Sequence, residues 1–102
     1  MDKPITMIAH LRAAPGKGDA LAALLTEQAG VVRKTEPGCL YYRLHRSTQD
    51  PDVFVFYEAY VNQAELDVHM KSPHIAAYRK RRADEGLAVG AVEIEYLQAL
   101  TE

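Results

Sequence analysis

The residues best suited to moving protons are Glu58, Tyr60 and His69. Glu58 and Tyr60 stand two residues apart in an expected strand, so their side chains project from the same face. His69 follows in a helical segment, three residues after Leu66, and both side chains are expected to point toward the sheet. A carboxylate beside an imidazole can orient the ring and raise its basicity. The pattern indicates a general base, His69, with Glu58 as its orienting partner and Tyr60 as a hydrogen-bond donor to a substrate oxygen.

A second group of residues is expected to line a substrate pocket next to these three. His74 follows Ser72 and Pro73 in the first turn of the next helix, where the helix dipole favours the neutral imidazole. Tyr78 and Phe56 are expected to complete the pocket wall. A purely structural interpretation stays open, because an inward-facing histidine is often a satisfied core residue and a strand glutamate can bond to a helix end.

Motifs for other chemistries are weak. His69 and His74 are five residues apart with a proline between them, unlike the i, i+4 pair of a helical metal site. Cys39 is the only cysteine, so it has no partner for a metal site or a disulfide. No serine lies in a glycine-rich nucleophile turn. We therefore expect no metal ligands and no cofactor.

Composition argues against nucleic acid and membranes as partners. The 102 residues carry a formal net charge of −2, whereas nucleic-acid binding usually needs a basic excess. The basic run from Arg79 to Arg82 is expected to be mainly a solvated helix face, with a minor role in gathering anionic ligands at a pocket mouth. No stretch approaches the ~20 apolar residues of a membrane span. The segment from Met1 to Pro4 lacks the features of a signal peptide, so we expect a cytoplasmic protein.

Hydrophobic periodicity predicts one domain, residues 1–102, with four strands and three helical segments. The strands are expected at 5–13, 39–46, 53–61 and 89–100. A long helix is expected at 18–34, a short one between the caps Asn62 and Ser72, and a third from Pro73 to about Glu85. The resulting order, β-α-β-β-α-β, is typical of the ferredoxin-like α+β fold with an antiparallel sheet and its helices on one face.

The third expected strand is apolar on both of its faces. One face carries Val53, Val55, Tyr57, Ala59 and Val61, and the other carries Phe54, Phe56, Glu58 and Tyr60. Two helices cover only one face of a four-stranded sheet, so the second face needs a partner. We expect a two-fold homodimer through the sheet face. The alternative is that these side chains sit singly on the surface, which is common.

Three motifs in the chain resemble the antibiotic-biosynthesis monooxygenase (ABM) family: Pro15-Gly16-Lys17, Glu36-Pro37-Gly38-Cys39, and the string from Phe56 to Tyr60 that continues through His69 to Ser72-Pro73-His74. The resemblance implies a dimeric α+β barrel built from two ferredoxin-like sheets. It also implies a pocket that includes Glu58, Tyr60, His69 and His74. Several members oxidise quinols or polyketide phenols without metal, flavin or haem.

The resemblance implies a cofactor-independent monooxygenase that acts on a small quinol or phenol with dioxygen. Two other branches of the family offer different functions. Enzymes that process a phosphorylated autoinducer share the Tyr-Glu-Ala-Tyr pattern, but their histidine in the first helix would fall near Gly30 here. Haem-degrading members have a proximal histidine that would fall near Arg79. The alternatives are therefore an isomerase on a small phosphorylated signal molecule, or a ligand-binding dimer without turnover.

Overall fold

The strands and helices follow the order expected from the sequence. The computed structural model describes residues 4–101, so the expectation for the first three residues lies outside the described part of the chain. The elements are β1 (Ile5–Ala13), α1 (Gly18–Thr35), β2 (Cys39–Arg46), β3 (Val53–Tyr60), α2 (Gln63–Lys71), α3 (Pro73–Asp84) and β4 (Ala88–Gln98).

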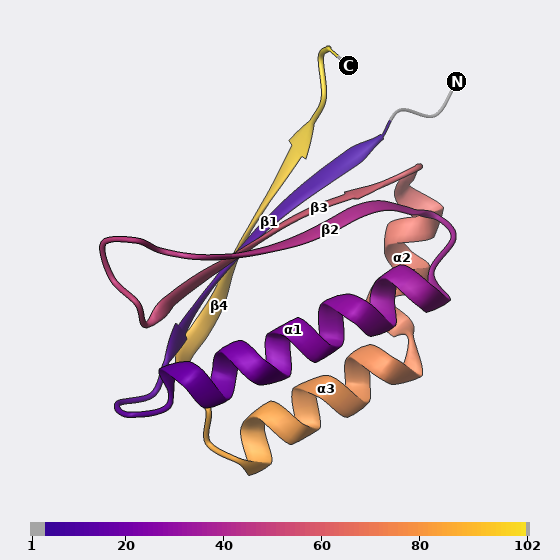
Figure 1. The fold of residues 1–102 in the computed structure, drawn as a ribbon. Helices are drawn as coiled ribbons and strands as arrows, with labels where there is room; N and C mark the ends of the chain where they lie inside the picture. The colour runs from indigo at the N-terminus through magenta and orange to yellow at the C-terminus, as the bar shows by residue number, and fades with distance from the viewer. Residues whose placement is uncertain (1–3, 102) are drawn as a thin grey trace.

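The strands form one antiparallel sheet in the order β2-β3-β1-β4, and α1 and α3 lie on the same side of it (Figure 1). This confirms the ferredoxin-like α+β fold. The strand β4 ends earlier than expected, at Gln98, because its pairing with β1 ends where Ile5 meets Gln98.

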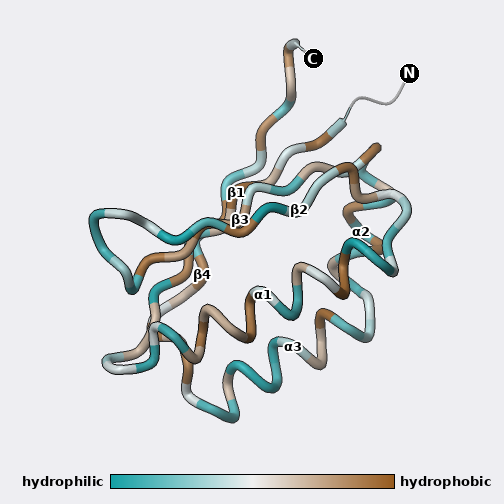
Figure 2. The backbone as a smooth tube through the Cα atoms, in the orientation of Figure 1, coloured by the Kyte–Doolittle hydropathy of each residue, from teal (hydrophilic) through white to brown (hydrophobic). Residues whose placement is uncertain are grey.

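The helix α1 packs on the sheet through one apolar stripe. Leu21, Leu25 and Val32 recur at helical spacing and are fully buried. Figure 2 shows the resulting alternation of hydrophobic and hydrophilic turns along α1. This helix ends next to the turn at Glu36, whose backbone N–H bonds to the carbonyl of Val32 at 3.0 Å. The packing of α1 therefore fixes the place of the residues that follow it.

The caps of the two shorter helices differ from each other. The Asn62 side chain accepts a hydrogen bond from the Glu65 backbone N–H at 3.0 Å, so the expected cap of α2 is confirmed. Ser72 stands at the N-cap position of α3 but its hydroxyl makes no cap bond. The hydroxyl instead donates to the carbonyl oxygen of His69 at 2.8 Å and contacts the ring of His74 at 3.1 Å. The expected N-cap position of Ser72, followed by Pro73 at the first helical position, is confirmed, but its hydroxyl links α2 to α3 and does not cap α3.

A bulge in β2 decides which tyrosine enters the core. The pairing of β2 with β3 shifts between Cys39 and Tyr41, so one residue, Leu40, has no partner and is exposed. After the shift, Tyr42 pairs with Glu58 and is buried. Strict alternation would place Tyr41 and Cys39 on the same face. The bulge therefore turns Tyr42 toward the helices and leaves Tyr41 on the opposite face.

The two faces of the sheet have different surroundings. The side of β3 with Phe54, Phe56 and Tyr60 is buried beneath the helices, whereas Val55 is half-buried and Tyr57 is exposed on the other side. Between residues 4 and 101, no helix has both the length and the apolar character needed to cross a bilayer.

Candidate functional site

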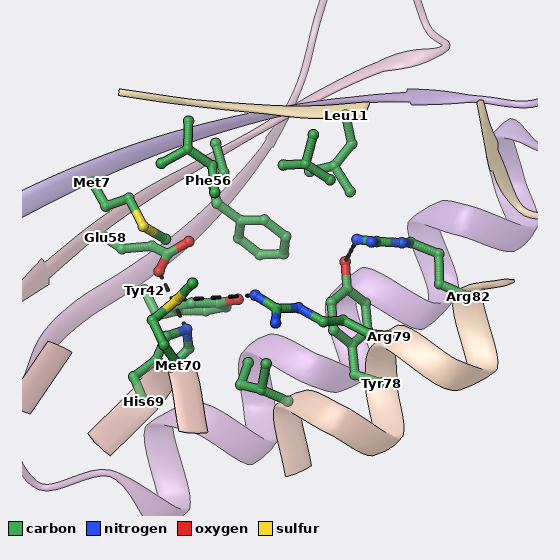
Figure 3. Close-up of a pocket in the computed structure, with 14 residues that line it drawn as sticks. Met7, Leu11, Tyr42, Phe56, Glu58, His69, Met70, Tyr78, Arg79 and Arg82 are labelled. Carbon is green, nitrogen blue, oxygen red and sulfur yellow. Dashed lines mark hydrogen bonds and ion pairs between the residues drawn. The ribbon is translucent and has the colours of Figure 1, made fainter. Parts of the chain in front are cut away.

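A cavity of about 250 Å³ lies between the sheet and the helices α2 and α3 (Figure 3). An apolar cavity of about 150 Å³ is enough to hold benzene, so this one has room for an aromatic ring with substituents. Its walls are mainly apolar and include Phe56, Tyr78 and Ile75. Polar groups reach it from β3, α2 and α3: Glu58, His69, Arg79 and Arg82.

The imidazole of His69 is held by Glu36. Nδ1 of His69 lies 2.8 Å from Oε1 and 2.9 Å from Oε2 of Glu36, and both side chains are buried. An ionised carboxylate only accepts hydrogen bonds, so Nδ1 must carry the proton. In the neutral ring, Nε2 then has the free lone pair. Burial lowers the pKa of His69, although Glu36 opposes this effect, so the ring is neutral at pH 7.

Glu58 faces the other nitrogen of the same ring. Its Oε1 atom lies 3.6 Å from Nε2 of His69, which is longer than a hydrogen bond, and it accepts a hydrogen bond from the Tyr60 hydroxyl at 2.6 Å. Burial raises the pKa of Glu58 to about 7, and the Tyr60 hydrogen bond partly opposes that rise. Glu58, whose pKa lies near 7, and the neutral imidazole of His69 thus face each other on one wall of the cavity.

His74 lies on the far side of Glu36 from His69. Its Nε2 atom contacts Oε2 of Glu36 and also lies 3.1 Å from the Ser72 hydroxyl. Because that hydroxyl already donates to a carbonyl, Nε2 of His74 is the donor in both contacts. Its side chain is 22% exposed, compared with 6% for Glu36. The chain of contacts Glu58–His69–Glu36–His74 therefore runs from the cavity to the solvent side.

Within residues 4–101, one group that could hold a metal ion consists of Glu36, His69 and His74. Their ligand atoms lie within 4.8 Å of one another, and a carboxylate with two imidazoles suits a divalent transition metal. In the structure the two imidazoles instead donate hydrogen bonds to the carboxylate. A metal would have to displace the Nδ1 proton of His69.

The candidate residues from the sequence fall into two groups. Phe56, Glu58, His69 and Tyr78 line the cavity, as expected. Tyr60 does not line it, because its hydroxyl is taken up by Glu58, so we reassign Tyr60 from substrate contact to positioning Glu58. His74 also does not line the cavity, because it stands behind Glu36.

Glu36 is the site residue that the sequence interpretation missed. The sequence interpretation names it only within the motif Glu36-Pro37-Gly38-Cys39 and expects Glu58 to orient His69. One signal could have found it: Glu36 follows the last residue of a long helix, where the helix dipole disfavours a carboxylate. An acid in that position needs positive or hydrogen-bond-donating partners, and two histidines supply them here.

Cys39 takes no part in this chemistry. Burial, reinforced by the carboxylates of Glu36 and Glu58, raises the pKa of its thiol to about 12. The thiolate is the nucleophilic and metal-binding form, so Cys39 stays an inert thiol at neutral pH.

Comparisons with known proteins agree with the fold. PA3566 from Pseudomonas aeruginosa is 35% identical, covers 99% of this chain and 98% of its own, and has a TM-score of 0.85. Rv0793 from Mycobacterium tuberculosis is 32% identical, with 97% of both chains covered and a TM-score of 0.85. The uncharacterized protein sll1783 of Synechocystis is 26% identical over 83 residues, which are 81% of this chain. The chain spans about half the length of that curated relative, 56%.

A comparison with models of protein families identifies the family of this chain. The model described as "Antibiotic biosynthesis monooxygenase" matches residues 4–81, which include β1, β2, β3, α2 and every residue of the contact chain from Glu36 to His74. The match thus covers most of the chain, and it confirms the resemblance drawn from the sequence motifs. The chain belongs to the antibiotic biosynthesis monooxygenase family.

Proposed function

We propose that the protein is a cofactor-independent monooxygenase that oxidises a small quinol or phenol with dioxygen. Membership of the family supports an oxygenase, and the cavity has the size and apolar walls that an aromatic ring needs. The observation that carries the proposal is the arrangement of His69. Glu36 holds its Nδ1 proton, so the lone pair of Nε2 is turned toward the cavity beside Glu58.

A base in this position activates a phenol toward dioxygen. Nε2 of His69 takes the phenolic proton, and the electron-rich phenolate gives its electrons to dioxygen to form a ring hydroperoxide. The imidazolium returns a proton to that peroxide, and Glu36 stabilises the imidazolium while it exists. Loss of the ring hydrogen and of hydroxide, which leave together as water, then yields a quinone. One phenol and one dioxygen give one quinone and one water.

Glu58 and His74 have distinct parts in the proton transfers. Glu58, whose pKa lies near 7, can hold or release a proton next to Nε2 of His69 at the pH of the reaction. His74 also hydrogen-bonds to Glu36, so it helps to hold the carboxylate that orients His69. The apolar walls exclude water from the anion and keep it oriented.

We also propose that the active unit is a homodimer formed through the face of the sheet that the helices leave bare. Half-buried Val55 and exposed Tyr57 lie on that face. Tyr57 stacks on Tyr41 with ring centroids 5.2 Å apart, which makes a flat aromatic surface. Apolar surface of this kind on a sheet is typical of an interface between identical subunits.

Oxygen uptake tests the proposed activity. Purified protein would be added to a panel of hydroquinones, naphthoquinols and phenols in an oxygen electrode, with each substrate's own autoxidation subtracted. The expected result is uptake that scales with protein and disappears in His69→Ala, with quinone formed in equal amount. If the folded wild type consumes no oxygen above autoxidation with any member of the panel, the proposal is wrong.

A second candidate function is an isomerase on a small phosphorylated molecule. The observation in its favour is that two arginines, Arg79 and Arg82, line the same cavity. The pair of Glu58 and His69 would then move a proton between neighbouring carbons. Turnover without oxygen uptake would favour this function, and binding without any turnover would favour a ligand-binding protein.

A further inference from the structure

The second half of α3 is strongly basic, and Figure 2 shows it as mostly hydrophilic. Its four consecutive basic residues are Arg79, Lys80, Arg81 and Arg82. Lys80 forms an ion pair with Asp84 at 2.5 Å, and Arg81 pairs with two surface carboxylates at 2.7 and 2.9 Å. Arg79 and Arg82, three positions apart and therefore on one side of the helix, line the cavity instead. The run thus divides into a solvated pair and a pair that faces the cavity.

The two arginines at the cavity have no acidic partner in the part of the chain that the structure describes. Within residues 4–101, no ion pair includes either of them. Arg82 donates one hydrogen bond to the Tyr78 hydroxyl at 3.0 Å, and its guanidinium lies 5.2 Å from the centre of that ring. Arg79 only approaches the sulfur of Met70, at 4.0 Å. A guanidinium has five donors, so most of the donors of both residues have no partner among residues 4–101.

The nearest acid in the cavity does not use these donors. Glu58 accepts a hydrogen bond from the Tyr60 hydroxyl and faces His69. It forms no ion pair with either arginine. In Figure 3 the Arg79 side chain reaches from α3 into the cavity below Phe56, and the Arg82 side chain bends toward Tyr78. The cavity therefore has an acid–base end and a cationic side, with apolar walls around them.

We propose that the ligand of this cavity carries an anionic group, a carboxylate or a phosphate, which Arg79 and Arg82 bind while its aromatic ring lies against the apolar walls. Guanidinium forks match the oxygens of both groups, and such bonds strengthen where water is partly excluded. The orientation of the ring's hydroxyl toward His69 rests on the proposed function; the anion site itself does not. The substrate class is thus a hydroxylated aromatic acid or phosphate ester.

Anaerobic calorimetric titration tests this inference without any need for turnover. The probes are 2,5-dihydroxybenzoate, 4-hydroxyphenyl phosphate and neutral hydroquinone. Each is titrated into the purified wild-type protein in the oligomeric state that it has in solution. Hydrogen bonds to a charged group strengthen binding more than those to a neutral group. We therefore expect an anionic probe to bind roughly tenfold to a hundredfold more tightly than hydroquinone. The affinity ratio of the carboxylate and the phosphate probe identifies which anion the site prefers.

Three variants decide whether the arginines are responsible. Arg79→Gln and Arg82→Gln should each remove most of the preference for the anionic probe over hydroquinone. Lys80→Gln removes the same charge from the same helix outside the cavity, and it should keep the preference. Light scattering on all three variants checks that the oligomeric state is unchanged.

Several outcomes overturn the inference. The first two are equal affinity for anionic and neutral probes, and no binding of any probe up to millimolar concentration. The other two are an equal loss of the anion preference in Lys80→Gln, and a change of oligomeric state confined to the two arginine variants. The proposed oxidation fails separately. Strong binding of the anionic probes without oxygen uptake in air would leave the anion site intact and remove the monooxygenase proposal.

Discussion

Nδ1 of His69 lies 2.8 Å from Oε1 of Glu36, although the two residues are 33 positions apart in the chain. Glu36 stands at the end of α1 and His69 in α2, so the packing of both elements against the sheet creates this contact. The contact decides which nitrogen of His69 has the proton. It therefore also decides that the basic nitrogen faces the cavity.

The first prediction concerns Glu36→Gln. Glutamine has the same shape, and its carbonyl can still accept a hydrogen bond from Nδ1 of His69. It has no charge, however, to stabilise the imidazolium. Because a general base contributes ~10²–10⁴-fold to a rate, we expect turnover to fall by at least ~10²-fold while the melting temperature changes little. The measurement is oxygen uptake beside a thermal melt.

Glu27→Gln is the matched control for that change. Glu27 is an exposed residue of α1 that pairs with Arg81 at 2.7 Å. Surface ion pairs contribute about 0–1 kcal/mol, so this variant should keep full activity. Normal turnover in a folded Glu36→Gln protein would remove Glu36 from the mechanism.

The second prediction separates the roles of His69 and Glu58. If His69 is the base, His69→Ala should lose at least ~10²-fold of turnover with the fold retained. Glu58→Gln should lose less, because the imidazole and its Glu36 partner remain. If His69 is only a core residue, His69→Ala should instead be destabilised by about 1–3 kcal/mol, with near-normal turnover per folded molecule. Oxygen uptake and melting temperature, measured on the same preparations, distinguish the two cases.

Much of the fold could be predicted from the sequence because local signals and burial agree. The run of β-branched and aromatic residues in β3, the apolar stripe of α1 and the cap at Asn62 each point to one structure. The bulge at Leu40 could not be predicted, because it leaves no distinct pattern in a strand that is apolar on both faces. The bond of the Ser72 hydroxyl could not be predicted either, since the carbonyl that accepts it belongs to His69 in α2.

The site was predicted only in part, for a similar reason. Glu58, His69, Phe56 and Tyr78 lie on one strand and two neighbouring helices, and their periodicity already indicates that they face inward. Glu36 lies in a turn, where no periodicity applies, and its partners are distant in the chain. Contacts of this kind depend on how α1 and α2 pack, which spacing alone does not reveal.

The third prediction concerns how stability depends on pH through Glu58. Its pKa is raised by burial from the ordinary 4.5 to about 7, so the folded state keeps a proton that the unfolded chain has already lost. Its contribution to stability is therefore full below pH 4.5 and is lost as the pH rises to about 7. At about 1.4 kcal/mol for each pKa unit, the loss is of the order of 3 kcal/mol.

Glu58→Gln isolates that contribution, because glutamine does not titrate. The free energy of unfolding of the variant relative to wild type should rise between pH 4.5 and 7 and stay level above it. His69 acts in the opposite direction, since burial lowers its pKa and stability falls as the pH drops below its unfolded value of 6.5. Taking the difference between two proteins that both keep His69 largely removes this effect. A difference that does not change with pH would contradict the raised pKa of Glu58.

The fourth prediction is that the active form needs no metal. Protein dialysed against a strong chelator should keep its full oxygen uptake. Added Zn²⁺ should inhibit, because a metal on Glu36, His69 and His74 would replace the Nδ1 proton of His69 and leave the remaining proton on Nε2. That nitrogen could then no longer accept a proton. Activity that is lost on chelation and restored by a metal would contradict this prediction.

The fifth prediction is a homodimer through the bare face of the sheet, whose charges are arranged for self-association. On that face the register places Arg43 and His45 on β2, the apolar Val55 on β3, and Glu93 and Glu95 on β4. The positive charge of Arg43 thus lies at one edge of the sheet, and the negative charges of Glu93 and Glu95 lie at the other. A two-fold axis parallel to the strands brings the positive edge of one subunit over the negative edge of its partner.

Val55→Glu and Val68→Glu test this arrangement with the same substitution in two places. Val55 is half-buried in the middle of the bare face, whereas Val68 is exposed on α2, away from it. Light scattering should give twice the chain mass of 11.4 kDa for the wild type and for Val68→Glu. Val55→Glu should give the monomer mass, because it would bury a carboxylate of each subunit in the interface. A wild-type monomer that unfolds cooperatively would rule out the dimer, and a dimeric Val55→Glu protein would place the interface on another surface.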